Sequence, residues 1–330
     1  MPDMNPTTQS ILLLTAYFGE SSGGNHKPLS PTEWGRFASW LSKNGRNPEG
    51  LLHDTEDVLV GWKDKTITTE RIQSLLGRSA ALALSVERWE RAGILVVTRG
   101  DANYPHRLKK RLSTFSPPLF FYCGNLKLMN SNAVAVIGSR NATTSDMEYA
   151  AFLGDEICGQ GYSVISGGAK GIDEAAMLGA LKCGGSAVGV LSNGLMHLVT
   201  SLKYREYLMS GSLLLISPYS PEASFNVGNA MGRNKYVYCM SDAAVVVASD
   251  KDKGGTWSGA VENLKKDWVP LWAKRNPDEN SGVSELVKRG ARWLPEKDMS
   301  ISSLVMDTNN NRAESAMQGV QGSLSFDYIK

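Results

Sequence analysis

The sequence predicts an α/β protein in which a helical N-terminal domain precedes a parallel sheet. Three observations support this prediction. Residues before 93 show helical spacing, later apolar runs alternate with helical patterns, and the main runs end in glycine-containing turns. Strands of parallel sheets are buried on both faces and therefore read as continuous apolar runs. Strands that alternate with helices indicate a parallel sheet covered by helices.

Composition limits the classes of function. The 330 residues suffice for two domains, and a net charge of +2 means that any site for a polyanion must be a local patch. The four cysteines form no CxxC pair and the four histidines have no metal-ligand spacing, so we expect reduced thiols, no metal and no cofactor. Since no run reaches the ~18 apolar residues of a membrane span, we expect a cytoplasmic protein.

Residues 1–105 are predicted to form the helical domain. A helix begins near Pro31 with Thr32 as its predicted cap, and Asn44-Gly45 ends it. Its stripe of Trp34, Phe37, Trp40 and Leu41 favours core packing, with a base-stacking or partner-binding surface as the alternative. Further helices are predicted near 54–61, 69–76 and 79–92, and a short strand at 94–98.

Residues 106–130 are predicted to connect the two domains. Residues 106–111, HRLKKR, are the densest basic cluster of the chain. A solvated helix face is the default interpretation, and a contribution to nucleic-acid binding is the alternative. A strand is predicted at 119–123, after Pro117-Pro118.

The predicted sheet domain covers residues 131–295 and opens with the unit 133–173. A strand at 133–137 runs into Gly138-Ser139-Arg140, and Ser145-x-x-Glu148 has capping-box spacing for the next helix. A second strand at 162–165 runs into the turn Ser166–Gly171. Later strands are predicted at 187–191, 213–216, 243–248 and 269–273, with a helix at 229–240, and residues 296–330 are predicted to be a polar, flexible tail.

The glycine turns predict a site that holds anions. Gly138-Ser139-Arg140, Ser166–Gly171 and Gly254-Gly255-Thr256 each follow a strand, so they meet at one edge of a parallel sheet. Glycine admits close backbone approach, and helix N-termini attract phosphate. Arg140 can form a fork on a phosphate, and Lys170 is a point charge. For Asp173 we expect a structural role at the start of its helix.

Motifs for bond breaking are missing. The sequence contains no GxxxxGK[ST], GxGxxG, GxSxG or HExxH pattern. We therefore expect a protein that holds phosphate without catalysing a reaction. Phe225, in a loop rich in proline and asparagine, is the best candidate for stacking on a base.

These motifs resemble the DprA/Smf family of bacterial DNA-processing proteins. The resemblance covers roughly 75–295 and rests on AVAVIGSR (133–140), SGGAKGID (166–173), Asn193-Gly194, and Phe225 followed by Arg233-Asn234-Lys235. It implies an extended Rossmann-like sheet, binding of single-stranded DNA through its backbone, homodimers, and loading of a RecA-type recombinase during natural transformation. The DNA- and phosphate-binding residues predicted from the turns and the resemblance together are Gly138, Ser139, Arg140, Ser166, Gly167, Gly168, Ala169, Lys170, Gly171, Phe225, Arg233, Asn234, Lys235, Gly255 and Thr256.

Some positions depart from the family pattern. Lys170 stands where the family usually has arginine, the segment after Asn193-Gly194 lacks the expected tyrosine-proline pair, and the frequent C-terminal winged helix has no counterpart. The segment 254–264 drifts toward the LOG-like nucleotide hydrolases. A nucleotide-binding sensor or LOG-like hydrolase, possibly in phage defence, is therefore the alternative function.

Overall fold

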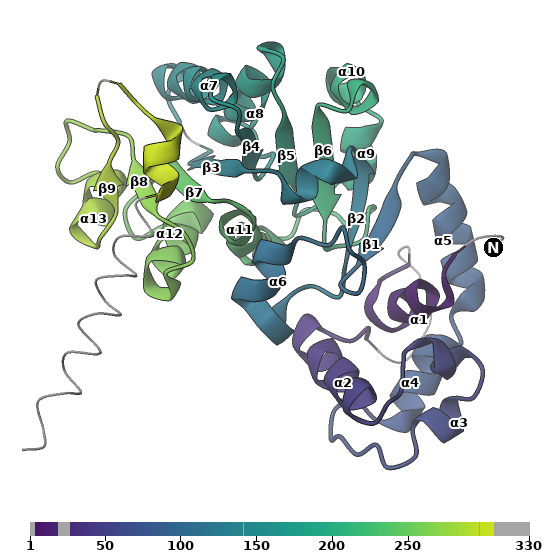
Figure 1. Cartoon of the computed structure of the whole chain (residues 1–330). Helices are drawn as coiled ribbons and strands as arrows, with labels where there is room; N and C mark the ends of the chain where they lie inside the picture. Colours follow the sequence, from purple (N-terminus) through teal and green to yellow (C-terminus); the bar gives the residue numbers. More distant parts are fainter. Residues whose placement is uncertain (1–3, 19–26, 141, 297, 307–330) are drawn as a thin grey trace, which may run out of the picture.

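The computed structural model describes residues 4–18, 27–140, 142–296 and 298–306 (Figure 1). The described residues form one nine-stranded sheet. Its strands are β1 (Leu95–Thr98), β2 (Leu119–Gly124), β3 (Ala133–Gly138), β4 (Ser163–Ser166), β5 (Ala187–Val190), β6 (Leu213–Ser217), β7 (Ala243–Ala248), β8 (Leu271–Ala273) and β9 (Arg292–Trp293). The order across the sheet is β1-β2-β6-β5-β4-β3-β7-β8-β9. The seven strands β3 to β9 are all parallel to one another, whereas β2 is antiparallel to both of its neighbours, β1 and β6. The predicted parallel α/β sheet is confirmed.

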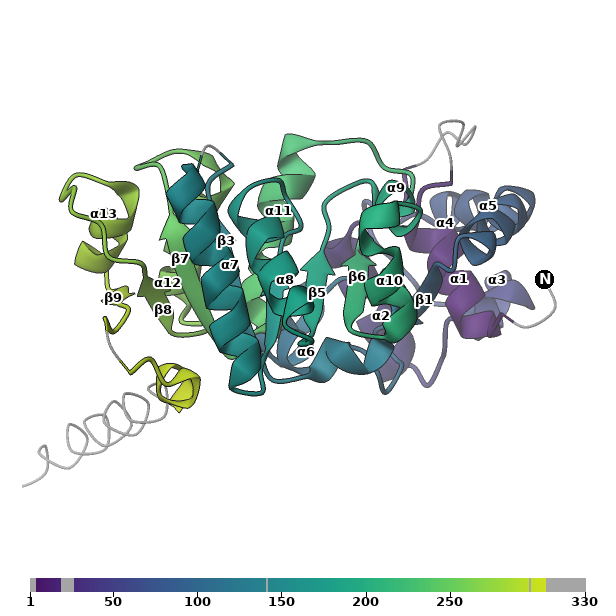
Figure 2. The same ribbon diagram turned by 90° about the horizontal axis from the view of Figure 1, so that it is seen from above.

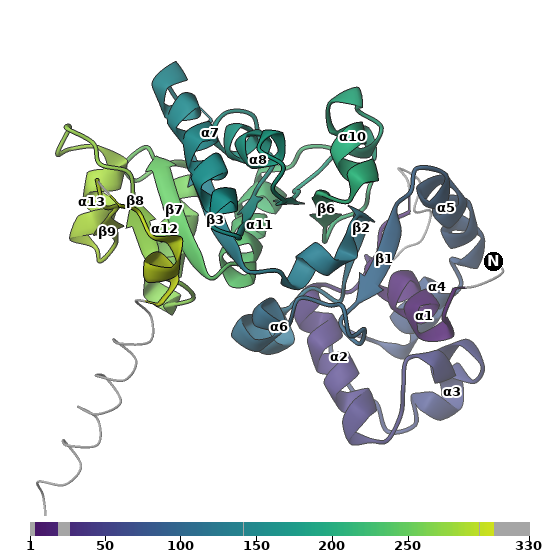
Figure 3. The same cartoon turned by 45° about the horizontal axis from the view of Figure 1, so that its top comes forward.

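The N-terminal helices form a lobe beside β1 at one end of the sheet (Figure 3). They are α1 (Pro6–Thr15), α2 (Pro31–Lys43), α3 (Thr55–Val58), α4 (Thr69–Leu76) and α5 (Ser79–Arg91), with a 3₁₀ turn at Glu49–Leu52. Trp34 and Phe37 are buried, and the Phe37 ring centroid lies 4.9 Å from that of Trp62. The aromatic stripe is therefore core, and the alternative of an exposed stacking or partner surface is wrong.

Helix α2 begins at Pro31 as predicted, but its N-cap lies two residues earlier than predicted. Ser30, not Thr32, is its N-cap and exchanges hydrogen bonds with Glu33, while Asn44 and Gly45 (φ 66°) end the helix as predicted. Pro31 occupies the first helical position, where its missing N–H costs no hydrogen bond. The cap therefore falls on the serine before the proline.

Helices cover both faces of the sheet (Figures 1 and 2). The face with α7 (Thr144–Gly159) and α8 (Ile172–Lys182) also carries α9 (Leu195–Val199) and α10 (Leu202–Ser210). The other face carries α6 (His106–Leu112), α11 (Val227–Met240), α12 (Gly254–Lys266) and α13 (Gly282–Lys288). Alternate residues of β3 serve the two cores: Val134 and Val136 face α8, whereas Ala135 and Ile137 face α11 and α12. The continuous apolar run of β3 follows from this double burial.

The capping box predicted at Ser145 and Glu148 is wrong. The box of α7 is formed by Thr143 and Asp146, whose carboxylate accepts a hydrogen bond from the Thr143 amide. Both pairs have the same spacing, so the pattern alone could not place the first turn. Asp146 also forms an ion pair with Lys274 at 2.7 Å, which ties α7 to the loop after β8.

The sheet extends beyond the predicted boundaries at both ends. Strand β1 lies within the predicted helical domain 1–105 and pairs with β2, and the unpredicted β9 pairs with β8. Residues 298–306 also pack on the sheet, because Ile301 and Leu304 are buried and the Trp272 indole donates to the Leu304 carbonyl at 3.2 Å. The flexible tail predicted from residue 296 therefore does not hold for this stretch, and residues 307–330 lie outside the described part.

The described residues include neither a helix that could span a membrane nor a cluster of metal ligands. Their helices are all too short or too polar to cross a bilayer. They also contain no group of three histidine, cysteine or carboxylate side chains arranged to hold a metal ion.

Candidate functional site

Three strand-to-helix loops meet at the carboxyl edge of the sheet, as the sequence predicted. Strand β3 lies between β4 and β7, so the loops after these strands are neighbours. The start of α11 closes the group from the side. Together they surround a cavity of about 390 Å³, which we call the edge cavity. It is lined by Ile137, Gly138, Ser139, Arg140, Ala169, Asp173, Phe225, Val227, Ala230, Met231, Arg233, Asn234, Asp250, Lys253, Gly254, Gly255 and Thr256.

Arg140 and Phe225 form the exposed wall of the edge cavity. The guanidinium carbon of Arg140 lies 4.9 Å from the Phe225 ring centroid, and the phenyl side chain is 51% exposed. No carboxylate among the described residues pairs with Arg140 at ion-pair distance. Stacking on the ring orients the guanidinium without neutralising it. The arginine therefore keeps its charge and its N–H donors for a ligand.

The N-terminus of α12 forms a second wall. Its N-cap residue Lys253 gives no side-chain hydrogen bond to the first turn, and that turn contains no acidic residue. Gly254 has a φ of 79°, so the chain can turn sharply into the helix. The N-terminus of α7 differs, because the capping box with Asp146 already satisfies it. Among these two helices, α12 is the one whose amides and dipole are open to an anion.

Arg233 lies in the floor of the edge cavity rather than on its rim. It is 5% exposed, and its guanidinium lies 3.9 Å from the equally buried carboxylate of Asp173. Burial lowers the pKa of Arg233, which Asp173 opposes and Arg140 reinforces. Burial likewise raises the pKa of Asp173, against the charge of Arg233 and the backbone amides of Gly138 and Ala169. The expected structural role of Asp173 is consistent with this buried pair.

Two polar atoms in the floor of the edge cavity lack hydrogen-bond partners within the described chain. Asp173 Oδ1 and Arg233 Nε have no hydrogen-bond partner within the described chain. Buried polar atoms normally find a partner, which can be protein, water or ligand. Both side chains line the edge cavity, although the two unsatisfied atoms themselves are buried beneath its surface.

Two glycines of the predicted turns are required by packing. A Cβ on Gly167 would overlap the Arg233 guanidinium, and a Cβ on Gly138 would lie 2.1 Å from Ile172 Cδ1. Gly138 therefore lets α8 approach β3, while Gly167 makes room for the buried arginine. A third turn residue, Ser166, is also structural, because its buried hydroxyl donates to the Val136 carbonyl at 2.5 Å.

Three more of the predicted residues, Asn234, Lys170 and Lys235, lie in different places. Asn234 lines the cavity, but its amide donates to the Gly255 carbonyl at 2.8 Å and so fixes the start of α12. Lys170 is exposed and next to Gly171, whose Cβ position is 3.6 Å from the Arg140 carbonyl oxygen. It therefore stands at the rim. Lys235 lies over the Tyr236 ring, away from the lining residues.

Lys253 and Asp250 line the cavity without having been predicted as site residues. Both belong to the charged turn before Gly254. The Asp250 carboxylate accepts a hydrogen bond from the Ser139 hydroxyl at 3.2 Å, so it links two of the loops. Both residues lie in the loop between β7 and α12, so they would have been found if every residue between a strand and the next helix had been counted as a site candidate.

The basic cluster 106–111 has a structural use. Arg107 forms an ion pair with Asp242 at 3.0 Å and donates to the Ser131 carbonyl at 2.7 Å. Arg111 donates to the carbonyls of Cys239 and Ser241, at 2.8 and 2.7 Å. The Arg111 hydrogen bonds satisfy carbonyls at the C-terminal end of α11, at the opposite end from the edge cavity. The predicted solvated face is confirmed for His106, Lys109 and Lys110, which are exposed, whereas these two arginines are partly buried and engaged by the protein.

Fold and site together define a Rossmann-like α/β protein whose sheet carries, at its carboxyl edge, a cavity lined by Arg140, Lys253 and the N-terminus of α12. The family model for DNA recombination-mediator protein A matches residues 95–305. Because this match covers more than half of the chain, the protein belongs to that family, and the resemblance to DprA/Smf is confirmed.

Individual relatives agree with this assignment. The chain is 26% identical over 217 residues to DNA processing protein DprA of Bacillus subtilis, covering 61% of this chain and 70% of that protein. It is 29% identical over 255 residues to DprA of Streptococcus pneumoniae, covering 74% and 84%. The crystal structure of S. pneumoniae DprA has a TM-score of 0.62 at 20% identity, covering 80% of this chain and 94% of that one. A structure from Helicobacter pylori, described as showing the single-stranded DNA binding mode of DprA, has a TM-score of 0.51 at 21% identity, covering 66% and 96%. At these identities the structures support the fold.

Proposed function

We propose that this protein binds single-stranded DNA by holding its phosphates in the edge cavity, without cutting the strand. One observation carries the proposal: the open N-terminus of α12 and the unneutralised, stacked Arg140 face the same cavity. Membership of a family of DNA-processing proteins supports it, as does the H. pylori relative described as binding single-stranded DNA.

The residues at the edge cavity are proposed to contact different parts of the DNA strand. The amides of Gly254 and Gly255 and the hydroxyl of Thr256 donate to a phosphate at the start of α12. Arg140 forms a fork on the same or the next phosphate. Phe225 presents its exposed ring to a base, which suits sequence-tolerant binding. Lys170 and Lys253 add point charges at the rim.

The buried pair beneath has a supporting role. Arg233 adds positive potential from below, while Asp173 limits the cost of burying that charge. Hydrolysis would need a carboxylate free to act on the ligand. The carboxylates that line the cavity are Asp173, which faces Arg233, and Asp250, which holds Ser139. This arrangement favours binding over catalysis.

Binding is tested by fluorescence anisotropy with labelled oligo-dT at several salt concentrations. Arg140→Ala should weaken binding about tenfold, and it should reduce the slope of log affinity against log salt by about 0.7 if one phosphate contact is lost. Arg140→Lys keeps the charge but loses the bidentate geometry, so its affinity for oligo-dT should lie between those of wild type and Arg140→Ala. Equal affinity and slope for wild type and Arg140→Ala would overturn the proposed site.

The alternative, a nucleotide sensor or hydrolase, is tested with the same protein. A nucleotide panel is incubated with it, and the products are separated by chromatography while thermal unfolding is followed in parallel. A nucleotide that raises the unfolding temperature binds the native state. Base release or hydrolysis would contradict the non-catalytic proposal.

Loading of a RecA-type recombinase, DNA uptake in transformation and homodimer formation remain part of the proposed function. Sedimentation of the purified chain tests the dimer. Strand exchange by a purified recombinase on DNA coated with single-strand-binding protein tests loading. The expected result is faster exchange when this chain is added, and no acceleration with Arg140→Ala.

A further inference from the structure

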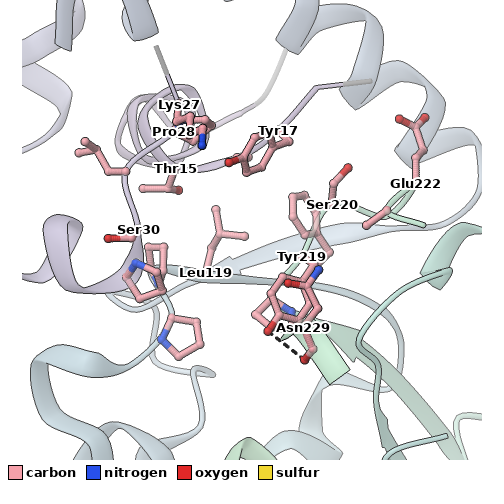
Figure 4. A pocket seen from close by; sticks show the side chains of 18 of the residues that line it. Thr15, Tyr17, Lys27, Pro28, Ser30, Leu119, Tyr219, Ser220, Glu222 and Asn229 are labelled. Carbon is pink, nitrogen blue, oxygen red and sulfur yellow. Dashed lines mark hydrogen bonds between the residues drawn. The ribbon is translucent and has the colours of Figure 1, made fainter. Parts of the chain in front are cut away.

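A second and larger cavity lies between the N-terminal lobe and the sheet (Figure 4). Its volume is about 970 Å³, and we call it the domain cavity. Residues from α1, the start of α2, the start of β2 and the segment after β6 form its walls. A cavity of this size can hold a small organic ligand or several rings of a larger one, since ligand sites span about 300–1,000 Å³.

The domain cavity opens at the same edge of the sheet as the edge cavity. A run of its lining residues directly follows β6, namely Pro218, Tyr219, Ser220, Glu222, Ala223 and Ser224. Strand β2 is antiparallel to β6, so its beginning at Leu119 lies beyond the carboxyl end of that strand. Strands β6 and β3 are three positions apart in the sheet, which corresponds to about 14 Å.

The start of α11 separates the two cavities. Asn229 lines the domain cavity and its neighbour Ala230 lines the edge cavity. The Tyr219 hydroxyl donates to the Asn229 carbonyl at 3.2 Å, as Figure 4 shows, and fixes the shared wall. Exposed Phe225 and Val227 lie on this wall at the edge-cavity side. A flexible chain bound in one cavity can therefore continue into the other across α11.

Aromatic and proline rings form part of the walls of the domain cavity. Tyr17 and Tyr219 project into it from opposite sides (Figure 4). The other ring-bearing residues that line it are Pro28, Pro31, Pro117, Pro118, Pro218 and Phe121. The Tyr17 side chain is 51% exposed, so its ring is available to a ligand. Aromatic rings with a polar end suit a partner that is flat on its faces and polar at its edge.

The charges of the domain cavity are mostly neutralised within the protein. Arg71 forms an ion pair with Glu33 at 2.7 Å, and Arg88 with Glu222 at 3.2 Å. Phosphate binding needs concentrated positive charge or open helix N-termini, as in the edge cavity. The α2 N-terminus here is closed by its own capping box. The domain cavity therefore suits the uncharged, flat part of a ligand.

We propose that the domain cavity receives bases of the DNA strand whose phosphates occupy the edge cavity. This inference rests on the proposed function and extends it to the N-terminal lobe. A single strand carries both chemistries, phosphates on one side and flat bases on the other. Base stacking on aromatic side chains tolerates any sequence. Tyr17 and Tyr219 then serve as stacking residues, and the prolines form the apolar walls.

The test compares Tyr17→Ala with Tyr17→Phe, which keeps the ring. Binding is measured with oligo-dT of about 5 and about 20 nucleotides, a range that brackets known single-strand sites. A third probe is an abasic oligomer of the longer length, with the same phosphates and no bases. Tyr17→Ala should bind the long oligo-dT about fivefold or more weakly, while the short oligo-dT and the abasic oligomer show no change. Tyr17→Phe should bind all three like wild type.

A second variant approaches the cavity from its other side. Ser220 projects into the cavity near Tyr219 (Figure 4), and Ser220→Trp fills the space while leaving the Tyr219 hydrogen bond to Asn229 in place. It should lower affinity for the long oligo-dT in the same probe-dependent way. Thermal unfolding of each variant checks that the fold is retained.

The outcomes separate this inference from the function on which it rests. If Arg140→Ala weakens binding but Tyr17→Ala and Ser220→Trp bind all probes like wild type, the domain cavity is not a base site and the edge-cavity proposal stands. If Arg140→Ala has no effect, the proposed function itself fails. A free nucleoside that protects the chain from unfolding and is not displaced by oligo-dT would overturn the inference in favour of a small-molecule site.

Discussion

The two ends of helix α11 use arginine in opposite ways. At its C-terminal end, Arg107 and Arg111 are fully engaged by backbone carbonyls and by Asp242. At its N-terminal end, Arg140 stacks on Phe225 and faces a cavity without a carboxylate partner among the described residues. The dense cluster in the sequence therefore builds the fold, and the isolated arginine is the better candidate for a ligand. The sign of the nearby backbone dipoles explains the difference, since carbonyls at a helix end attract guanidinium groups.

The largest expected effect concerns Arg233, which belongs to neither class. Arg233→Ala leaves the Asp173 carboxylate buried without its partner and should lower the free energy of unfolding by about 3–5 kcal/mol. Urea denaturation measures the change. The double variant Arg233→Met with Asp173→Leu removes both charges and should recover much of the loss. An unaltered midpoint for Arg233→Ala would mean that the pair is not buried as described.

The second effect contrasts the two ends of α11 directly. Arg107→Ala should lower the free energy of unfolding by about 1.5–3 kcal/mol, because it removes charge-assisted hydrogen bonds, and leave DNA affinity unchanged. Arg140→Ala should show the reverse pattern, with weaker binding and normal stability. Urea denaturation and oligo-dT anisotropy are measured on both variants. A binding loss for Arg107→Ala in fully folded protein would break the comparison.

A third effect tests the open N-terminus of α12. Thr256→Asp places a carboxylate in its first turn, which should stabilise the helix by about 0.3–1 kcal/mol. The same charge should weaken oligo-dT binding about fivefold, since two unit charges about 4 Å apart in water interact by about 1 kcal/mol. Thr256→Asn is the neutral control of similar shape. Tighter binding by the aspartate variant would exclude a phosphate at this position.

The smallest effect concerns the closed N-terminus of α7. Partial burial acts to raise the pKa of Asp146, but hydrogen bonds from Lys274 and Thr143 outweigh it and lower the pKa below 3.8. The folded state therefore binds this proton less readily than the unfolded state does. The stabilisation is complete above pH 3.8 and is lost as the pH falls through the lower, folded value. Asp146→Asn should lose about 0.5–1 kcal/mol at pH 7 and show a flatter decline in acid, measured by urea denaturation at several pH values.

Local patterns were sufficient for the elements and for the edge where the site lies. Continuous apolar runs gave β3 to β7 within one or two residues, because burial on both faces of a parallel sheet leaves a strong signal. The two-residue β9 escaped, because Arg292–Trp293 is too short and only half-buried. The N-cap of α2 and the capping box of α7 were each misplaced by two residues, since Ser, Thr, Asp and Glu at neighbouring positions offer equivalent spacings.

What the sequence by itself determined is the order of strands and helices, the family, and the convergence of glycine turns at one sheet edge. These follow from periodicity and from the rule that parallel strands place their carboxyl ends together. Only the tertiary structure decided which cations are available. The sequence does not distinguish Arg233 from Arg140. In the structure Arg233 is buried beside Asp173, whereas Arg140 faces the edge cavity, because burial and partners come from segments far apart in the chain. For the same reason the sequence did not reveal the domain cavity, whose walls come from α1, α2, α4, α5, β2, the segment after β6 and α11.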